Sequence, residues 1–195
     1  LKDVYFRTRL LESSIVYAEA EQCYDTLAQD IKGALRGQTE PTTDVPIKGL
    51  VLDLRGNPGG TLTCAVSTVD LFIDSGTIVS TQSHRGIESY QASSTTPYLS
   101  LPLAILVDGG TASAAEIIAG ALQDYGRATV VGSQTFAKGS VQTLLSPLAN
   151  GSALKITTAR YLTPRGRSFS EMGLLPDIEV ILSLIHISEP TRLNP

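Results

Sequence analysis

The stretch that decides the fold spans residues 108–142 and reads DGGTASAAEIIAGALQDYGRATVVGSQTFAKGSVQ. It follows the apolar run Leu103–Val107, turns at two glycines and continues into a helix that we expect to begin at Thr111 or Ser113. A serine hydroxyl is thereby placed where a buried strand turns sharply into a helix. Helix N-terminal N–H groups lie beside that position and can stabilise an oxyanion. Lys138 lies 25 residues after this serine, in a second turn rich in small residues.

On both sides of this stretch, short apolar runs alternate with helical patterns. We predict strands at residues 4–7, 49–55, 76–83, 87–91, 102–107, 128–131, 140–145, 153–162 and 178–180. We predict helices at residues 15–35 and 61–72 and from the serine turn onward. The Asn150-Gly151 pair predicts a hairpin turn. Strands alternate with helices through the middle of the chain, so the predicted class is α/β with a mixed sheet.

The bulk composition limits the classes of function. The 195 residues are 42% hydrophobic, which is enough for one well-packed domain or one domain with an appendage. The formal net charge is −4 without a Lys/Arg cluster, which argues against nucleic-acid binding. Apolar runs stay below the roughly 18 residues that a membrane span needs. The chain starts at Leu1, and we read it as a fragment without information on targeting.

The last residues have a foreign character. Residues 182–192 read LSLIHISEPTR, which resembles the translation of a transposase adapter used in DNA library preparation. We therefore predict a core at residues 1–181 and a non-native tail at residues 182–195, with His186 in the tail. The alternative is a natural β-tail, against which Pro190 counts.

Cys23 and Cys64 are the two cysteines of the chain. They can pair in an oxidising compartment, or stay as two buried thiols. The sequence leaves both readings open.

A serine nucleophile needs a base, and the chain offers two candidates. His84 is the one histidine outside the tail, but it stands in a polar hairpin loop where a solvated surface histidine is expected. Lys138 is the competitor, because burial among uncharged neighbours disfavours an ammonium ion. The competing interpretation of Lys138 is an ordinary surface lysine in a turn.

Other polar residues have structural interpretations beside functional ones. Gly59-Gly60 is either an oxyanion hole or a plain strand-to-helix turn. Asp53 and Arg55 are expected to form a structural ion pair. Glu116, three residues after the serine, fits the acid of a capping box.

Several ordered motifs together resemble a known family. GLVLDLRGNPGG, GGTASAAEIIAGALQDYGRATVVG, TFAKGSVQ, ALKITTARYLTPRGRS and GLLPDIEV follow one another at suitable distances. They are similar to the carboxyl-terminal processing proteases, or tail-specific proteases, of the S41 peptidase type over residues 47–180. The resemblance implies a ClpP/crotonase-like mixed β-sheet core with flanking helices. The PDZ domain that usually precedes this core in the family is absent from the fragment.

The resemblance also implies catalytic residues. Ser113 matches the nucleophile and Lys138 matches the general base. Gln142 matches the glutamine that orients the lysine in some members, and Asp124 matches an acidic position counted with the site in some members. The family usually has glycine at the position of Ala137, so a positive φ there would misplace Lys138.

The resemblance also implies an oxyanion hole, formed by the amide of Gly59 or Gly60 together with the amide of Ala114. No metal and no cofactor is implied, and no metal-ligand spacing is present in the sequence.

The implied function is a serine endopeptidase with a Ser-Lys dyad that cleaves proteins near the C-terminus through an acyl-enzyme. The implied partner is a protein or peptide with a free C-terminus, and the implied location is the periplasm or cell envelope, with a full-length parent that is membrane-anchored or oligomeric in some members. Two alternatives stay open. One is an inactive S41-like module that binds peptides or hydrophobic ligands. The other is a crotonase-like acyl-CoA enzyme, which shares the two-amide oxyanion hole and needs no Ser-Lys pair.

Overall fold

The computed structural model describes residues 5–37, 46–93, 98–145, 152–170 and 172–180. The predicted hairpin turn at Asn150-Gly151 and the predicted foreign tail lie outside these residues.

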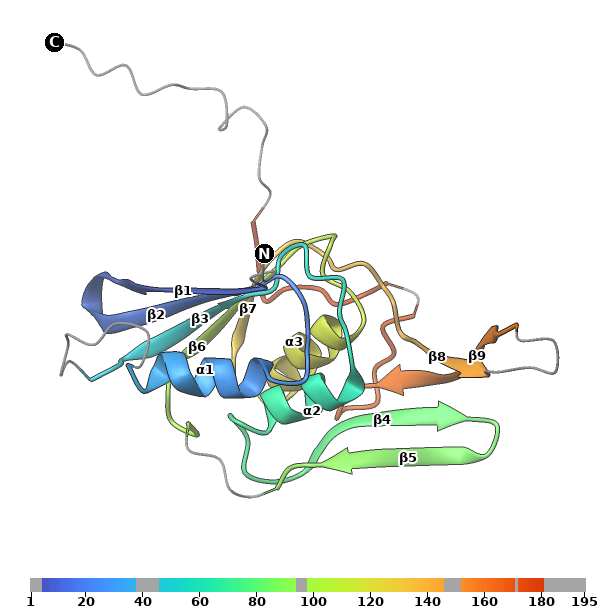
Figure 1. Cartoon of the computed structure of the whole chain (residues 1–195). Helices are drawn as coiled ribbons and strands as arrows, with labels where there is room; N and C mark the ends of the chain where they lie inside the picture. The colour runs from blue at the N-terminus through green and yellow to red at the C-terminus, as the bar shows by residue number, and fades with distance from the viewer. Residues whose placement is uncertain (1–4, 38–45, 94–97, 146–151, 171, 181–195) are drawn as a thin grey trace, which may run out of the picture.

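A six-stranded sheet forms one layer of the molecule (Figure 1). Its strand order is β1-β2-β3-β6-β7-β10. The strands are β1 (Phe6–Leu11), β2 (Ile15–Ala20), β3 (Gly49–Asp53), β6 (Leu103–Val107), β7 (Thr129–Gly132) and β10 (Ile178–Glu179). The β1–β2 pair is antiparallel and every other pair is parallel, so the sheet is mixed as predicted.

Three helices lie on one face of this sheet (Figure 1). They are α1 (Leu27–Leu35), α2 (Leu62–Val69) and α3 (Ala114–Asp124). The strand side chains that face them are small or branched and buried, such as Leu52 and Ile105, which are fully buried. All but one of the α3 residues are buried, because this helix packs between the sheet, α2 and the second sheet.

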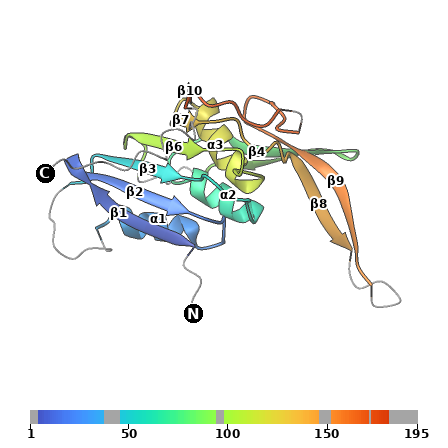
Figure 2. The ribbon, with the colours of Figure 1, turned by 90° about the horizontal axis from the view of Figure 1, so that it is seen from above.

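A second, antiparallel sheet has the order β5-β4-β9-β8. Its strands are β4 (Thr77–Ser83), β5 (Gly86–Gln91), β8 (Ser140–Leu145) and β9 (Leu154–Leu162). Seen from above, the β8–β9 ribbon extends away from the core (Figure 2). Most of β9 is exposed or half-buried, as expected for a ribbon without a layer on its outer face.

The predicted helix at residues 15–35 is wrong in its first half. Residues 15–20 are strand β2, and only residues 27–35 are helical. The burial of β2 alternates, with Val16, Ala18 and Ala20 inside. Period-two burial is the signature of a strand that packs one face on a core. The remaining predicted strands and helices are confirmed within a few residues at each end.

Cys23 and Cys64 form a disulfide, which settles the choice that the sequence left open. The bond joins the segment between β2 and α1 to the first turn of α2, and the two cysteines are 41 positions apart in the sequence. Both cysteines are buried.

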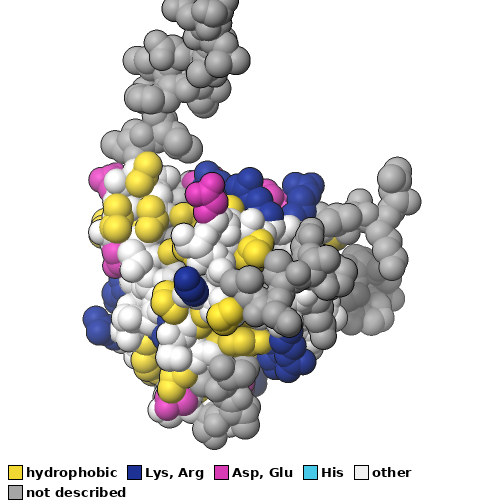
Figure 3. Space-filling view, turned by 90° about the vertical axis from the view of Figure 1, so that its left-hand side faces the viewer, with side chains coloured by type: hydrophobic (Ala, Val, Ile, Leu, Met, Phe, Trp, Pro, Cys, Tyr) yellow, Lys and Arg dark blue, Asp and Glu magenta, His cyan; other side chains and the backbone are white. Residues whose placement is uncertain are grey.

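Surface charge is dispersed on the face shown in Figure 3, where basic, acidic and hydrophobic side chains are interspersed. In the described part of the chain, none of the helices is both long enough and apolar enough to cross a membrane.

Asp53, at the end of β3, forms the predicted ion pair with Arg55. The Arg55 Nη2 atom lies 2.6 Å from Asp53 Oδ2, and the Tyr17 hydroxyl donates to the same oxygen at 2.5 Å. Burial by itself raises the pKa of Asp53, but the hydrogen bonds from Arg55 and Tyr17 outweigh burial, so the pKa of this carboxyl is lowered.

This pair predicts a dependence of stability on pH. Because the folded-state pKa of Asp53 lies below the unfolded value of about 3.9, its contribution is present above that value. The contribution is lost as pH falls through the lowered folded-state pKa. We expect Asp53→Asn to cost about 2 kcal/mol at pH 7 and to flatten the loss of stability between about pH 5 and pH 3. Urea unfolding at pH 7, 5 and 3 measures both effects.

The matched control for this experiment is Glu19→Gln. Glu19 is a half-buried partner of the exposed Arg7, with 3.7 Å between Arg7 Nη1 and Glu19 Oε2, and an ion pair at the surface contributes little. Equal pH profiles for the wild type and Asp53→Asn would contradict the expectation.

Candidate active site

Ser113 occupies the sharp turn between β6 and α3. Its backbone has φ 56° and ψ −119°, a combination that costs a non-glycine residue conformational energy. The helix begins at the next residue, Ala114, so the helix N-terminus is directed at the serine. A non-glycine residue held in such a conformation is a common feature of functional sites.

The Gly59-Gly60 turn packs against this serine, and neither position has room for a side chain. A Cβ atom on Gly59, whose φ is 96°, would lie 2.7 Å from the Ser113 Cβ and 2.9 Å from the Ala114 nitrogen. A Cβ atom on Gly60 would lie 1.6 Å from the carbonyl oxygen of Cys23. Glycine is therefore required at both positions, since it alone allows the turn to approach the serine and the segment behind it.

The hydrogen bonds of the turn decide between its two amides. The Gly59 N–H donates to Asn57 Oδ1 at 2.9 Å and is occupied. The N–H groups of Gly60 and Ala114 have no hydrogen-bond partner among the described residues. Of the predicted oxyanion donors, Gly60 and Ala114 are therefore available and Gly59 is not.

Asn57 is a residue of this site that sequence reasoning missed. It is fully buried, its Nδ2 donates to the Ala20 carbonyl at 2.8 Å, and its own carbonyl accepts the Ala112 N–H at 2.9 Å. It thereby connects strand β2, the glycine turn and the serine turn. Its position between two glycines in GNPGG was the available signal, because a buried amide in a turn must satisfy several hydrogen bonds.

Glu116 connects the serine turn to the lysine turn. It is fully buried, and its Oε2 accepts the Ser113 N–H at 2.8 Å and the Lys138 N–H at 2.9 Å. Its Oε1 accepts the Thr135 hydroxyl at 2.6 Å and the Ala137 N–H at 2.9 Å. The predicted bond to the Ser113 N–H is therefore present, but Glu116 has a larger role than a helix cap.

The same contacts fix how close the two turns lie. Because one oxygen accepts both N–H groups, the backbone nitrogens of Ser113 and Lys138 are at most about 6 Å apart. A second link comes from the Phe136 N–H, which donates to the Thr111 carbonyl at 3.0 Å. The structure thus brings the backbones of the predicted nucleophile and the predicted base together.

The predicted burial of Lys138 is wrong. The residue is exposed, and its ammonium group has no hydrogen bond or ion pair within the described parts of the chain. The Lys138 N–H points inward to Glu116, and its neighbour Phe136 is 63% exposed. The uncharged neighbours of Lys138 in the sequence suggested an apolar environment. Neighbours in the sequence bury a side chain only if they fold over it, and here they do not.

The side chains of Gln142 and Asp124 have hydrogen-bond partners other than Ser113, Glu116 and Lys138. Gln142 is exposed on β8, and its Nε2 donates to Thr157 Oγ1 at 2.7 Å and to Ser140 Oγ at 3.2 Å, so its role toward Lys138 stays a prediction. Asp124 is the last residue of α3, whose 11 residues span about 16 Å.

Asp124 therefore lies at the opposite end of the helix from Ser113. It pairs with the Arg167 guanidinium and accepts the Arg165 N–H at 2.9 Å. We correct its expected role in the site to one of holding the turn at residues 163–167.

His84 is exposed between β4 and β5, as its polar hairpin loop indicated. No cluster of three His, Cys, Asp or Glu side chains that could hold a metal ion occurs among the described residues.

Ala137 has φ 74°, the conformation that the sequence analysis identified as a problem for any residue except glycine. We expect Ala137→Gly to stabilise the protein by roughly 0.5–1 kcal/mol, because relief of the strain exceeds the entropy that glycine adds to the unfolded state. The expected rise in Tm is about 2 °C, measured by thermal unfolding. Ala159→Gly in strand β9 is the control and should lower Tm; a drop in both variants would contradict the strain argument.

A serine at a strained strand-to-helix turn, beside two amides without partners, defines the kind of site that acyl-transferring hydrolases use. The model of peptidase family S41 matches residues 17–180, and this chain belongs to that family. The motifs identified in the sequence are therefore those of this family.

Two curated relatives illustrate the similarity. The chain is 43% identical over 173 residues to the carboxy-terminal-processing protease of Bartonella bacilliformis, covering 87% of this chain and 39% of that protein. It is 37% identical over 178 residues to the carboxyl-terminal-processing protease of Synechocystis, covering 91% of this chain and 40% of that protein. The chain thus spans about two fifths of the length of these relatives.

Solved structures show the same fold. The photosystem II D1 C-terminal processing protease superposes with a TM-score of 0.75 at 31% identity, covering 90% of this chain and 47% of that one. A lipoprotein from Streptococcus agalactiae matches with a TM-score of 0.70 at 20% identity, over 94% of this chain and 68% of that one, and shows likeness of fold alone.

Proposed function

We propose that this chain carries the catalytic core of a serine peptidase that cleaves protein substrates near their C-terminus, with Ser113 as nucleophile and Lys138 as general base. The observation that carries this proposal is the Glu116 carboxylate, which binds the backbone N–H groups of both residues through one oxygen. Membership of peptidase family S41 and the names of the relatives support the same activity.

The proposed reaction has two halves. A neutral Lys138 amine takes the proton of the Ser113 hydroxyl as the serine oxygen attacks the substrate carbonyl carbon. The resulting oxyanion accepts hydrogen bonds from the Gly60 and Ala114 amides, and one such donor commonly contributes ~3–4 kcal/mol. The C–N bond then breaks and the leaving amine takes the proton from Lys138. Water, activated by the same amine, releases the acyl group as a carboxylate and restores the serine.

This mechanism requires the Lys138 side chain to turn from solvent toward Ser113. The short distance between the two backbones allows this without a change in the fold, since the turn itself is already held by Glu116. Catalytic contacts are often longer in a free enzyme than in the complex with substrate.

Replacement of Lys138 tests the base assignment. We expect a fluorophosphonate to label Ser113 in the wild type, and Lys138→Ala to slow this labelling by roughly 10²–10⁴-fold. Lys138→Arg should be as slow, because arginine keeps the positive charge but does not give up its proton. Mass spectrometry of the labelled Ser113 peptide over time measures each rate.

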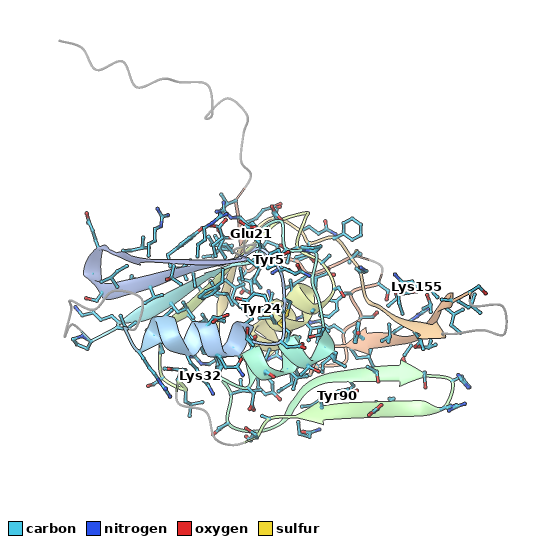
Figure 4. The ribbon with its side chains drawn as sticks, in the orientation of Figure 1. Tyr5, Glu21, Tyr24, Lys32, Tyr90 and Lys155 are labelled. Carbon is cyan, nitrogen blue, oxygen red and sulfur yellow. A yellow bond between two sulfur atoms is a disulfide. The ribbon has the colours of Figure 1, made fainter. Side chains whose placement is uncertain are left out.

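Lys155→Ala is the matched control, because Lys155 lies on the exposed β9 strand away from the helices (Figure 4). It should label at the wild-type rate. Wild-type rates in Lys138→Arg would show that the lysine acts as a cation and not as a base.

The exposure of Lys138 also favours a second candidate, an inactive S41-like module that binds peptides or hydrophobic ligands. The same experiment separates the two. A folded wild type whose Ser113 is not labelled, but which binds a C-terminal peptide, would favour the binding module.

The disulfide supports a location outside the cytoplasm. Disulfides such as Cys23–Cys64 persist in oxidising compartments, which supports our proposal that the protein works in the periplasm or cell envelope. Its partner in this proposal is a protein or peptide with a free C-terminus. Membrane anchoring or oligomerisation of a longer parent protein stays a prediction.

A further inference from the structure

We propose that the Cys23–Cys64 disulfide is a positioning element of the oxyanion hole, which holds the Gly60 amide in the direction that the reaction needs. This inference rests on the proposed peptidase function. We call residues 20–25 the backing segment and residues 57–61 the oxyanion turn.

The backing segment contacts the oxyanion turn along its whole length. At its start, the Ala20 carbonyl accepts the Asn57 side-chain amide at 2.8 Å. In its middle, the Cys23 N–H donates to the Gly59 carbonyl at 3.0 Å, and Cys23 forms a parallel bridge with Gly60. The direction of the Gly60 N–H is therefore set by the position of Cys23.

The other end of the oxyanion turn, at Thr61, is held by a hydrogen bond from the segment that carries Cys64. The Cys64 N–H donates to Thr61 Oγ1 at 3.1 Å, and the Thr61 hydroxyl donates to Asp25 Oδ1 at 2.6 Å. The turn thus lies between two segments, one carrying Cys23 and the other carrying Cys64. The disulfide is the covalent bond that closes this arrangement.

The backing segment has further support of its own, at its outer side. The Glu21 N–H donates to the Tyr5 carbonyl at 2.9 Å, and the rings of Tyr5 and Tyr24 lie 6.4 Å apart (Figure 4). These contacts hold the segment to the residue that precedes β1. Its hydrogen-bonded link to the first turn of α2 runs through Asp25 and Thr61, and the bond between these two side chains is exposed.

A fixed direction matters because an oxyanion hole acts through donors that are already aimed at the developing charge. A Gly60 amide that moves with a loosened backing segment must be ordered again in each reaction. The expected effect is on the rate of acylation, while binding of the substrate changes little.

The test compares oxidised wild type, wild type reduced with dithiothreitol, and Cys23→Ala/Cys64→Ala. Reduction transfers two electrons and two protons from the dithiol, which becomes a cyclic disulfide, and leaves two thiols. Three readouts are used: hydrogen exchange of the hydrogen-bonded amides at positions 23 and 59, the rate at which a fluorophosphonate labels Ser113, and the KM for a peptide substrate. We expect both disulfide-free forms to exchange these amides at least tenfold faster and to label at least tenfold more slowly, with an unchanged KM for a peptide substrate.

Ile78→Ala is the control for a general loss of stability, because Ile78 is fully buried in β4 and belongs neither to the backing segment nor to the oxyanion turn. It should lower Tm while exchange of the amides at positions 23 and 59 and labelling of Ser113 stay at wild-type values. Labelling that follows Tm equally in all variants would overturn the inference, and so would unchanged exchange or unchanged labelling in the disulfide-free forms. A wild type that is not labelled at all contradicts the peptidase proposal instead, and the exchange data still report whether the disulfide orders the turn.

Discussion

Ser113→Ala is expected to reduce cleavage of a C-terminal peptide by roughly 10⁴–10⁶-fold and to abolish labelling by a fluorophosphonate. The reason is that the proposed acyl-enzyme forms on the Ser113 oxygen, and loss of a nucleophile that acts together with its base removes nearly all covalent catalysis. The amides of Gly60 and Ala114 stay in place, so a small residual rate is expected from the oxyanion hole alone.

The stability of this variant separates chemistry from folding. Alanine keeps the backbone N–H that donates to Glu116, and the positive φ costs alanine about as much as serine, so Tm should change little. Ser89→Ala, on the exposed β5 strand, is the control and should keep full activity. Cleavage by a correctly folded Ser113→Ala protein at the wild-type rate would mean that another group is the nucleophile.

The local geometry around the serine could be predicted from the sequence, because its causes are local. An apolar run, a glycine pair and a helical pattern follow one another within 20 residues, and the structure has β6, a turn and α3 at these places. The Gly59-Gly60 turn was predicted on the same grounds. The choice between its two amides was not, because it depends on the side chain of Asn57.

Residues 15–35 show how a pattern can mislead. Val16 and Ala20 are four residues apart, a spacing that fits one face of a helix and equally the same face of a strand. The burial of Ala18 distinguishes a strand from a helix here. Ala18 is fully buried, whereas its neighbours on both sides are only half-buried. Strand β2 pairs with the adjacent β1 and also with β3, and β3 is distant in the sequence.

Two predictions differ from the structure for different reasons: Lys138 is exposed, and Asp124 lies far from Ser113. Burial of a lysine depends on which segments fold over it, and the sequence around residue 138 carries no such information. Asp124 was included by resemblance, although its 11-residue separation from Ser113 on one helix places it about 16 Å away. Simple helix geometry outweighs the resemblance at this position.

Glu116→Ala is expected to be the most destabilising single change in the site. It leaves the part-buried N–H groups of Ser113, Ala137 and Lys138 and the buried Thr135 hydroxyl without their acceptor. Each unsatisfied buried group costs about 1–3 kcal/mol, so we expect a loss of at least about 4 kcal/mol and a fall in Tm of roughly 10 °C or more. Labelling of Ser113 should slow by at least about 10²-fold, since misplacement by 1 Å has that effect.

Glu116→Gln keeps this prediction testable if the alanine variant does not fold. The glutamine oxygen can still accept the Ser113 and Lys138 N–H groups, provided that its NH₂ group takes the place of Oε1. The Thr135 hydroxyl can then rotate to accept from the NH₂ group, but the Ala137 N–H faces a donor and loses its bond. We therefore expect a loss of about 2–3 kcal/mol and roughly tenfold slower labelling of Ser113, between the wild type and the alanine variant.

The ranking of the wild type, Glu116→Gln and Glu116→Ala by labelling rate distinguishes a helix cap from a residue that joins two turns. Glu88→Ala and Glu88→Gln on the exposed β5 strand are the controls and should leave stability and labelling unchanged. If Glu116 were only a helix cap, glutamine would serve as well as glutamate, because a capping box accepts either residue. Equal labelling in the wild type and Glu116→Gln, with a lower rate in Glu116→Ala, would therefore reduce Glu116 to a cap. A graded loss requires that both carboxylate oxygens hold the lysine turn against the serine.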